Sequence, residues 1–404
     1  MKSTHPTPML GLYIHIPFCK RKCDYCDFYS VAEDGALMDR YITALCAHLK
    51  ETAPFAKHHV VDTVYVGGGT PTLLGAKRLV VVLKTVQKYY ALSKDVEITI
   101  EANPDSAQDF RMLRSLRRAG CNRISLGMQS AHDSELEAVG RIHTMAQVTT
   151  AVEAIRKAKI KNLSLDLIYG LPNQTPDQWQ QSLAAAVALK PQHLSCYGLK
   201  LEENTPLFNR RDTLTLPDEE VQAKLYLDTV SYLAAAGYGQ YEISNFAQES
   251  HRSRHNMKYW TLGEYAGFGP SAHSDFGDVR YGYVRDIEGY IQGVLGDGDF
   301  VSETTHLTES DRDTEYLMLG LRTVEGIDGK VFERRFRRNF NCFLPFLTQC
   351  NEAGYVVEDQ GRWYLTPQGF LVSNQIIGGL LDVLSEDKLR RADAKARGDY
   401  RIIP

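Results

Sequence analysis

The sequence predicts an α/β protein, a partial (β/α) barrel followed by a small α+β domain. Strand-like and helix-like segments alternate from about residue 10 to residue 246, as expected for βαβ units with parallel strands. Six or seven such repeats fit a complete or partial barrel better than a short doubly wound sheet. The reactive residues follow the predicted strand ends, and a barrel places its functional site on that rim.

The first predicted domain spans residues 1–246. Its strands are short β-rich runs at 12–16, 62–68, 96–103, 123–129, 163–170, 193–201 and 239–244. Between them, apolar residues recur at helical spacing. These amphipathic stretches predict helices at 39–51, 75–90, 106–119, 146–158, 176–189 and 217–236.

The pattern changes after residue 246. Residues 247–305, with the Gly/aromatic stretch "YAGFGPSAHSDFG", predict connecting structure rather than further βα units. Residues 306–382 predict helices at 308–322, 327–338 and 341–353, a hairpin at 355–366 turning near Gln360 and Gly361, and a helix at 367–380. That order is typical of a small winged-helix-like domain. Residues 383–404 are a charged tail, expected to be frayed or loosely helical.

The composition excludes several classes of protein. A chain of 404 residues with 43% hydrophobic residues can fill a sizeable core, and its net charge of -4 gives no global attraction to nucleic acid or anionic lipid. No apolar run approaches the roughly 18 residues of a membrane span, and the first residues lack a signal-peptide pattern. We therefore expect a cytoplasmic protein that is not itself a membrane protein, with its cysteines reduced.

Three of the eight cysteines form a C-x3-C-x2-C array, Cys19, Cys23 and Cys26, in one loop after the first predicted strand. Four thiolates would complete a zinc site, whereas three leave one iron of a [4Fe–4S] cluster open for chemistry. The alternatives are a zinc site with a remote histidine, or three unpaired thiols. The other five cysteines are interpreted as buried bystanders: Cys46, Cys121, Cys196, Cys342 and Cys350.

With its lead-in "YIHIPF", the cysteine array resembles that of the radical SAM superfamily, and within it the anaerobic coproporphyrinogen III oxidase-like family. The resemblance covers nearly the whole chain. It implies a radical SAM barrel in which Cys19, Cys23 and Cys26 hold a [4Fe–4S] cluster and S-adenosylmethionine (SAM) binds its open iron.

The resemblance also implies the SAM-binding residues. Gly68, Gly69 and Thr70 in "VGGGTPT" match the family's site for the SAM amino group, and Glu101 in "IEANP" matches the carboxylate that pairs with it. Arg141 suits the methionyl carboxylate, since a guanidinium can pair bidentately, and Asp166 suits the ribose hydroxyls. The remaining matches are Tyr13 and Gln129. Each residue alone could be a surface charge or a cap, but their order on successive strand ends favours the cofactor site.

Two features indicate a branch of this family. The dehydrogenase pattern continues to a fourth cysteine, where this chain has Phe28, and the departure matches the sister branch of haem chaperones, HemW. The hexamer "HNMKYW" at 255–260 matches that branch's H-N-x-x-Y-W signature. It implies His255 as a haem ligand beside two flat aromatic rings. The alternative is a helix start with Asn256 as its cap.

The resemblance therefore implies a haem chaperone that binds haem, the cluster and SAM, and delivers haem to respiratory membrane haemoproteins. The alternative is an oxygen-independent coproporphyrinogen III oxidase that makes protoporphyrinogen IX. A third interpretation, a winged-helix nucleic-acid binder, rests on four arginines in "FERRFRRNF". It is disfavoured because the phenylalanines there form an apolar stripe that leaves the arginines on a solvated face. No nucleic-acid partner is expected, and a homodimer stays open.

Overall fold

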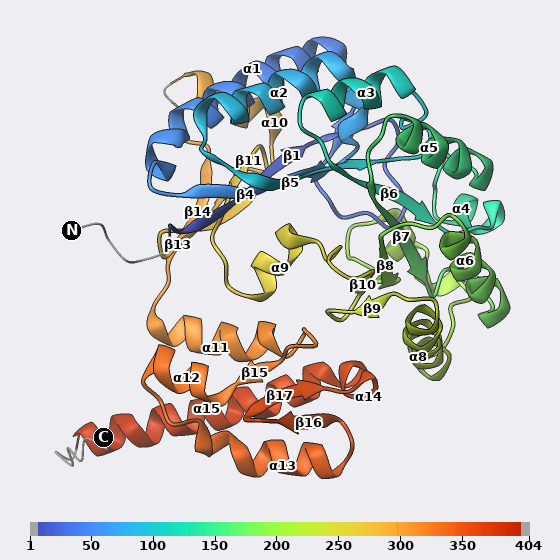
Figure 1. The fold of residues 1–404 in the computed structure, drawn as a ribbon. Coiled ribbons are helices and arrows are strands. Elements are labelled where there is room, and N and C mark those ends of the chain that lie inside the picture. Colours follow the sequence, from blue (N-terminus) through green and yellow to red (C-terminus); the bar gives the residue numbers. More distant parts are fainter. Residues whose placement is uncertain (1–6, 297, 397–404) are drawn as a thin grey trace. The chain divides into compact units, whose positions relative to one another are not determined.

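The structure is a computed structural model that describes residues 7–296 and 298–396 (Figure 1). It divides into two compact units. Unit 1 comprises Met1–Gly239, Ser244–Lys258 and Gly263–His306, and unit 2 comprises Gln240–Ile243, Tyr259–Leu262 and Leu307–Pro404. Residues 247–305, which we expected to be a connector, thus belong mainly to unit 1.

Unit 1 is built on an open sheet of twelve strands, with β14 (Val301–His306) and β9 (Gly239–Gln240) at its two edges. Seven neighbouring strands run parallel. In spatial order they are β11 (Tyr265–Phe268), β1 (Met9–Ile16), β4 (Val60–Gly68), β5 (Leu92–Ala102), β6 (Arg123–Gln129), β7 (Asn162–Tyr169) and β8 (His193–Gly198). The predicted fold, a partial barrel of βα units, is confirmed.

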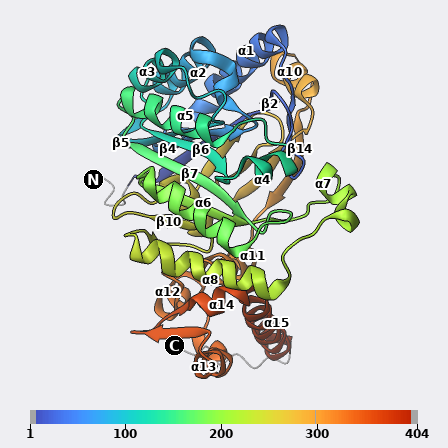
Figure 2. The same cartoon turned by 90° about the vertical axis from the view of Figure 1, so that its right-hand side faces the viewer.

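Helices follow the parallel strands, and most of the longer ones lie along the outer side of the sheet, as Figure 2 shows. They are α1 (Gly35–Thr52), α2 (Gly75–Tyr89), α3 (Phe110–Arg118), α4 (Asp133–Ala138), α5 (Met145–Lys157), α6 (Pro176–Ala188), α7 (Pro206–Asn209) and α8 (Glu219–Ala235). Capping boxes at Thr144 and Thr175 begin α5 and α6, because each threonine and the glutamine three residues later satisfy each other's backbone N–H groups.

Two parts of unit 1 differ from the expectation. The run 239–244 forms only the short β9, and the next strand, β10 (Asn245–Ala247), pairs antiparallel with β8. After α9 (Arg254–Trp260) the chain returns to β1 as β11. It then adds β12 (His273–Phe276), β13 (Val279–Tyr283), α10 (Ile287–Leu295) and β14. The strands β12, β13 and β14 run antiparallel and do not alternate with helices, so the βα pattern of the sequence did not predict them.

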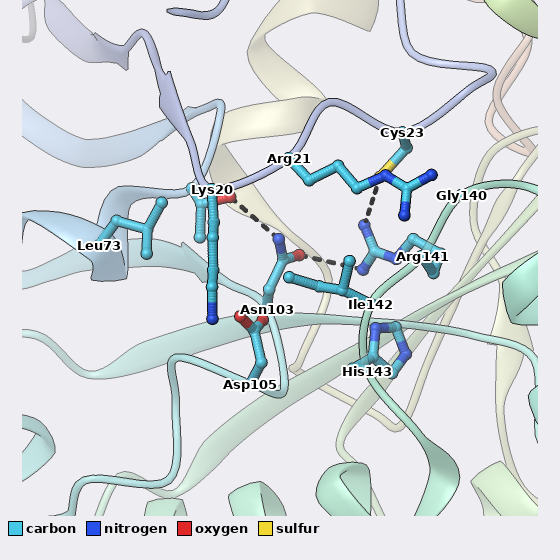
Figure 3. Close-up of a pocket in the computed structure, with 11 residues that line it drawn as sticks. Lys20, Arg21, Cys23, Leu73, Asn103, Asp105, Gly140, Arg141, Ile142 and His143 are labelled. Carbon is cyan, nitrogen blue, oxygen red and sulfur yellow. Dashed lines mark hydrogen bonds between the residues drawn. The ribbon is translucent and has the colours of Figure 1, made fainter. Parts of the chain in front are cut away.

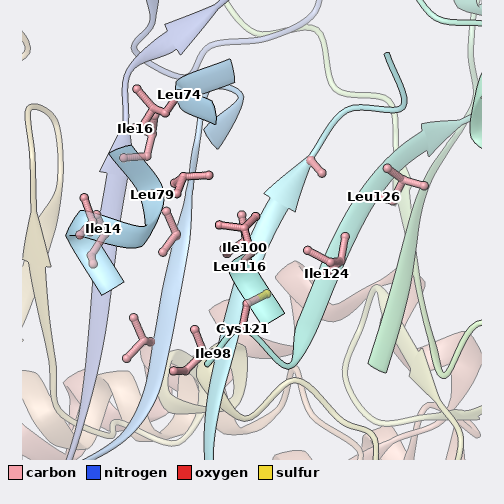
Figure 4. Close-up of a cluster of buried hydrophobic side chains, with 14 of the residues drawn as sticks. Ile14, Ile16, Leu74, Leu79, Ile98, Ile100, Leu116, Cys121, Ile124 and Leu126 are labelled. Atoms are coloured by element: carbon pink, nitrogen blue, oxygen red, sulfur yellow. The ribbon is translucent and has the colours of Figure 1, made fainter. Parts of the chain in front are cut away.

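The core of unit 1 lies between the sheet and its helices (Figure 4). Along β1 the even-numbered residues Leu10, Leu12, Ile14 and Ile16 are fully buried against this layer. The same alternation continues in β5 and β6, whose isoleucines pack with residues of α2, α3 and their neighbouring loops, namely Leu74, Leu79, Ile98, Ile100, Leu116, Cys121, Ile124 and Leu126. Each such side chain contributes about 1.5–3 kcal/mol to folding.

Because side chains alternate along a strand with a period of two, the odd-numbered residues point toward the other face of the sheet. These residues are largely polar, and they include Tyr13 and His15 of β1, Tyr65 of β4, Glu101 of β5 and Ser125 of β6. The inner face of the partial barrel is therefore a polar surface, which is where a charged cofactor can bind.

Unit 2 has a three-stranded sheet in the order β15 (Ile327–Asp328), β17 (Arg362–Leu365), β16 (Val356–Asp359). Its helices are α11 (Glu309–Gly320), α12 (Gly329–Phe336), α13 (Leu344–Glu352), α14 (Pro367–Leu371) and α15 (Ser373–Ala396). The predicted hairpin turns at Gln360 and Gly361, both with positive φ. The order of helices and hairpin is as expected, and the winged-helix comparison stays a prediction.

Within the charged tail, which was expected to be frayed or loosely helical, α15 continues to Ala396. Residues 397–404 lie outside the described residues. Across the ranges that the structure describes, the helices fall short of the length and apolarity that crossing a membrane requires.

Candidate cluster and cofactor site

A cavity of about 550 Å3 opens at the carboxyl ends of the parallel strands. It brings together ten of the predicted site residues, which are Cys19, Cys23, Cys26, Gly68, Gly69, Thr70, Glu101, Gln129, Arg141 and Asp166. Tyr13 and His255 lie outside this lining. The cysteine loop and the ends of β4 to β8 thus share one rim.

The cysteine loop is closed at its base by β2 (Phe18–Cys19), which pairs with β3 (Val31–Ala32). The three thiols are partly buried. Burial raises the pKa of Cys19 and raises that of Cys26 to about 11, so these thiols need a nearby positive group to ionise.

Within the residues that the structure describes, no three His, Cys, Asp or Glu side chains converge closely enough to hold a single metal ion. The ligands of a [4Fe–4S] cluster do not have to meet at one metal ion, because each cysteine binds a different iron at a separate corner of the cube. Three thiols around one cavity therefore fit the cluster that the sequence predicted.

Arg141 is linked to two of the cysteines through hydrogen bonds, of which Figure 3 shows those to Cys23 and Asn103. Its Nη1 donates to Cys23 Sγ at 3.4 Å, and its Nη2 donates to Asn103 Oδ1 at 3.0 Å and to the Gly127 carbonyl at 2.7 Å. Asn103 Nδ2 then donates to Thr70 Oγ1 at 2.9 Å, and that hydroxyl donates to Cys19 Sγ at 3.7 Å. Donors of this kind stabilise thiolates around a metal centre.

This network gives Arg141 partners within the protein, and its pairing with the SAM carboxylate stays a prediction. We expected its guanidinium to pair with the SAM carboxylate, but here it is directed at Cys23 and Asn103. Asn103 was missed by the sequence reasoning, although it stands in the same "IEANP" segment as Glu101. A cavity of about 10 Å3 beside Arg141, lined also by Lys20 and Asp105, has room for about one water molecule.

The turn after β4 needs glycine because neighbouring atoms leave no room for a side chain. Gly68 has a φ of 108°, and a Cβ built there would lie 2.6 Å from the His15 ring. A Cβ on Gly69 would lie 2.6 Å from the Phe18 carbonyl oxygen. Since a side chain is excluded at both positions, the backbone itself forms this part of the rim.

The N–H groups of this turn are already used. Gly68 donates to Glu101 Oε2 at 2.9 Å, Gly69 donates to the Ile16 carbonyl at 2.8 Å, and Thr70 donates to the Phe18 carbonyl at 2.7 Å. All three of these backbone N–H groups are therefore occupied. The Thr70 carbonyl accepts from the Leu73 N–H at 3.0 Å. A carbonyl oxygen has two lone pairs, so the carbonyl oxygens of the turn can still accept from an ammonium group of a ligand.

Glu101 lies beside the turn with both carboxylate oxygens engaged. Tyr65 donates its hydroxyl to Oε1 at 2.7 Å, and Gly68 donates its N–H to Oε2. Desolvation raises the pKa of this carboxyl to about 7, against the hydrogen bonds that lower it. A bound ammonium would supply the missing positive charge and favour the ionised form.

Asp166 and Gln129 occupy the far side of the rim. Three serine hydroxyls donate to the Asp166 carboxylate, the nearest being Ser195 at 2.7 Å, with Ser125 at 2.9 Å and Ser164 at 3.2 Å. Burial raises the pKa of this carboxyl. Gln129 has a φ of 62° where the pairing of β6 with β7 shifts register, and such backbone outliers often mark ligand sites.

Tyr13 and His15 interact with each other on β1. The Tyr13 hydroxyl and His15 Nδ1 are 3.0 Å apart, and His15 Nε2 lies 2.9 Å from the Tyr29 carbonyl. The carbonyl can only accept, so Nε2 carries the proton and Tyr13 donates to Nδ1. Burial lowers the pKa of His15 to about 4 and keeps it neutral. The Tyr13 hydroxyl is thus directed at His15 rather than into the cavity.

His255 is buried, at 1% exposed. Its Nδ1 lies 2.8 Å from Thr63 Oγ1, and its ring stacks on Tyr65 with centroids 5.2 Å apart. Burial lowers its pKa to about 3. The ring is enclosed in this packing, and the assignment of His255 as the haem ligand stays a prediction. The helix-start alternative is closer, although Ser253 rather than Asn256 accepts the capping bond.

Comparisons with known proteins agree with this architecture. Residues 13–186 match the family model described as the radical SAM superfamily, and residues 307–372 match the HemN C-terminal domain. The heme chaperone HemW of Bacillus subtilis (strain 168) is 35% identical over 380 residues, covering 93% of this chain and 100% of the relative. Heme chaperone HemW of Escherichia coli (strain K12) is 34% identical over 376 residues, covering 92% and 97%.

Among solved structures, coproporphyrinogen III oxidase (HemN) from Escherichia coli, described as a radical SAM enzyme, superposes with a TM-score of 0.79. It is 24% identical in sequence, and the match covers 92% of this chain and 89% of that chain. At this identity the likeness supports the fold, a partial barrel followed by a smaller domain.

Proposed function

Because the chain belongs to the radical SAM superfamily and, within it, to the HemW family of its curated relatives, we propose that it is a haem chaperone. In this proposal Cys19, Cys23 and Cys26 hold a [4Fe–4S] cluster, SAM binds at the adjoining rim, and haem is the cargo. The observation that carries the proposal is that the three thiols and the matching cofactor residues line one cavity of about 550 Å3.

Each side of the rim would have a separate task. The carbonyl oxygens of the glycine turn and the Glu101 carboxylate would accept hydrogen bonds from the SAM ammonium. Asp166 and Gln129 would orient the ribose, and Arg141 would stabilise the thiolate of Cys23 by its charge. A bound cluster supplies one-electron chemistry to the SAM sulfonium.

We place the haem at the mouth of the same cavity. Phe28 is 63% exposed and Tyr197 is 41% exposed, and both line the cavity. These rings provide flat apolar surface for a macrocycle. Lys22 and Lys200 also line the cavity, and their cations suit propionate groups. On this proposal Phe28, which replaces the fourth cysteine of the dehydrogenase pattern, has a direct function.

The destination of the haem is the part of the proposal that rests on family resemblance alone. We propose that the protein works in the cytoplasm and transfers haem to respiratory membrane haemoproteins. The alternative is an oxygen-independent coproporphyrinogen III oxidase, which would use the same cluster and SAM to make protoporphyrinogen IX.

The test is anaerobic reconstitution of the cluster, followed by addition of SAM with either haem or coproporphyrinogen III. We expect haem to bind, as read from its Soret band, and coproporphyrinogen III to remain unchanged by chromatography. Formation of protoporphyrinogen IX coupled to SAM cleavage would refute the chaperone proposal and identify the protein as the oxidase. Cys23→Ala should lose the cluster absorbance, and full retention of iron and sulfide would refute that ligand.

The position of the haem has its own matched pair of variants. Phe55 is 72% exposed on the short helix Ala53–Ala56 and lies outside the cavity lining. We expect Phe28→Ala to weaken haem binding about tenfold, which corresponds to about 1.4 kcal/mol for one lost ring contact, while Phe55→Ala leaves it unchanged. Equal affinities of the two variants would exclude the cavity mouth as the haem site.

A further inference from the structure

Unit 2 contains a cavity of its own, of about 330 Å3. Four positively charged side chains from the end of α12, the residues that follow it and α15 line this cavity, namely Arg337, Arg338, Lys388 and Arg391. Phe336 and Ala392 add apolar wall, and Glu309 at the start of α11 adds one acid. The cluster and SAM residues belong to unit 1, so this cavity has no part in the site described above.

Two acids hold three of the four cations in place. The Asp313 side chain is 1% exposed, forms an ion pair with Arg338 Nε at 2.7 Å and accepts a hydrogen bond from Lys388 Nζ at 2.9 Å. Asp387 forms an ion pair with Arg391 Nε at 2.7 Å. Each arginine carries five N–H donors, and these contacts use only part of them. The cations are thus positioned in advance while donors remain for a ligand.

Arg337 is the fourth cation, and it is placed differently. Its backbone is left-handed, with φ 51°, at the C-cap of α12, a position where glycine is usual. In the part of the chain that the structure describes, its exposed side chain has no ion-pair partner. The fold therefore keeps an uncompensated cation at the cavity in spite of an unfavourable backbone conformation.

The expected arrangement of this segment is confirmed only in part. Phe332, Phe336 and Phe340 are buried in the core of unit 2, as the apolar stripe predicted. The arginines beside them were expected to be an ordinary solvated face, and Arg334 fits that description because it is exposed and outside the cavity lining. Arg337 and Arg338 instead line a hollow.

The chemistry of the lining selects the kind of ligand. Nucleic acid and anionic membranes need an extended positive surface, whereas here Glu309, Asp313 and Asp387 offset most of the positive charge. A free phosphate ion would not need the apolar wall of Phe336 and Ala392. A carboxylate beside apolar side chains uses both features, since a guanidinium fork pairs bidentately with a carboxylate.

We propose that this cavity binds an acidic segment of a protein partner, with an aspartate or glutamate carboxylate pairing with Arg337 and an apolar neighbour packing on Phe336. The site is independent of the cluster, of SAM and of haem.

The test uses the full-length protein and a short fluorescein-labelled peptide of alternating glutamate and leucine, with binding read by fluorescence anisotropy. Arg337→Gly removes the cation and suits the left-handed backbone, so the variant should keep its fold. We expect it to weaken peptide binding about tenfold. Arg334→Ala removes a neighbouring cation outside the cavity and should leave the affinity within about twofold.

Three results would overturn the proposal. The first is absence of peptide binding, and the second is equal affinity in wild type and Arg337→Gly. The third is loss of peptide binding in the presence of millimolar inorganic phosphate or phosphatidylglycerol vesicles at constant ionic strength, which would identify a phosphate site instead. Cluster content measured in the same variants should not change.

Discussion

The left-handed turn at Gly68 makes the cofactor rim sensitive to a single methyl group. In Gly68→Ala the new Cβ would lie 2.6 Å from Cε1 and Nδ1 of His15, so the imidazole must move and lose its bonds to Tyr13 and Tyr29. Each bond contributes about 1 kcal/mol, and a left-handed alanine costs about 1–2 kcal/mol. We expect the free energy of unfolding of unit 1 to fall by about 3–4 kcal/mol.

Urea unfolding followed by circular dichroism measures this loss, and Gly237→Ala is the control. Gly237 also lies in unit 1 and has a φ of 87°, but a Cβ there meets nothing within 4 Å. The control should lose only the backbone contribution of about 1–2 kcal/mol. The reasoning about His15 is refuted if Gly68→Ala loses no more stability than Gly237→Ala.

Three further predictions concern other parts of the chain. The folded-state pKa of Glu101 is raised from 4.5 to about 7, so the folded state keeps a proton that the unfolded state releases, and the free energy of unfolding should fall as pH rises through that window. Urea titrations of Glu101→Gln should show a smaller fall. An unchanged pH profile in this variant would contradict the raised pKa. Thr229→Val removes the acceptor of the buried Trp179 indole N–H, a bond of 2.8 Å, and should cost unit 1 about 1–3 kcal/mol, whereas an unchanged urea midpoint would indicate another acceptor. In Gly369→Ala the new Cβ would overlap the Tyr355 carbonyl oxygen, so calorimetry should show the melting temperature of unit 2 lowered by about 10 °C with unit 1 unaffected.

The parallel strands could be predicted because their pattern is local. In β1 every second residue, from Leu10 to Ile16, is a buried leucine or isoleucine, a pattern visible within eight positions, and each strand is followed by an amphipathic helix. β11 could not be predicted in this way. It has four residues, "YAGF", and its partner β1 lies about 250 positions earlier in the chain. β14 has the exposed sequence "VSETTH", which carries no apolar pattern at all.

The candidate site shows the same limit at the level of side chains. Strand ends and the glycine turn predicted which residues share the rim, and Cys19, Gly68 and Glu101 all line the cavity. The direction of a side chain depends on partners from distant elements, and no spacing reveals these. Arg141 is directed to Cys23 by Asn103 and Gly127. His255 is buried because Tyr65 stacks on it.

The place of β1 between β4 and β11 has a consequence for synthesis on the ribosome. The edge of β1 that faces β4 can pair early, but the opposite edge must wait for Tyr265–Phe268 to be translated. At roughly 5–20 residues per second this takes on the order of ten to fifty seconds. During that time a buried, apolar strand has one unpaired edge, which is a template for association with other chains. The nascent protein should therefore depend on ribosome-associated chaperones until β11, the last parallel strand, has been translated.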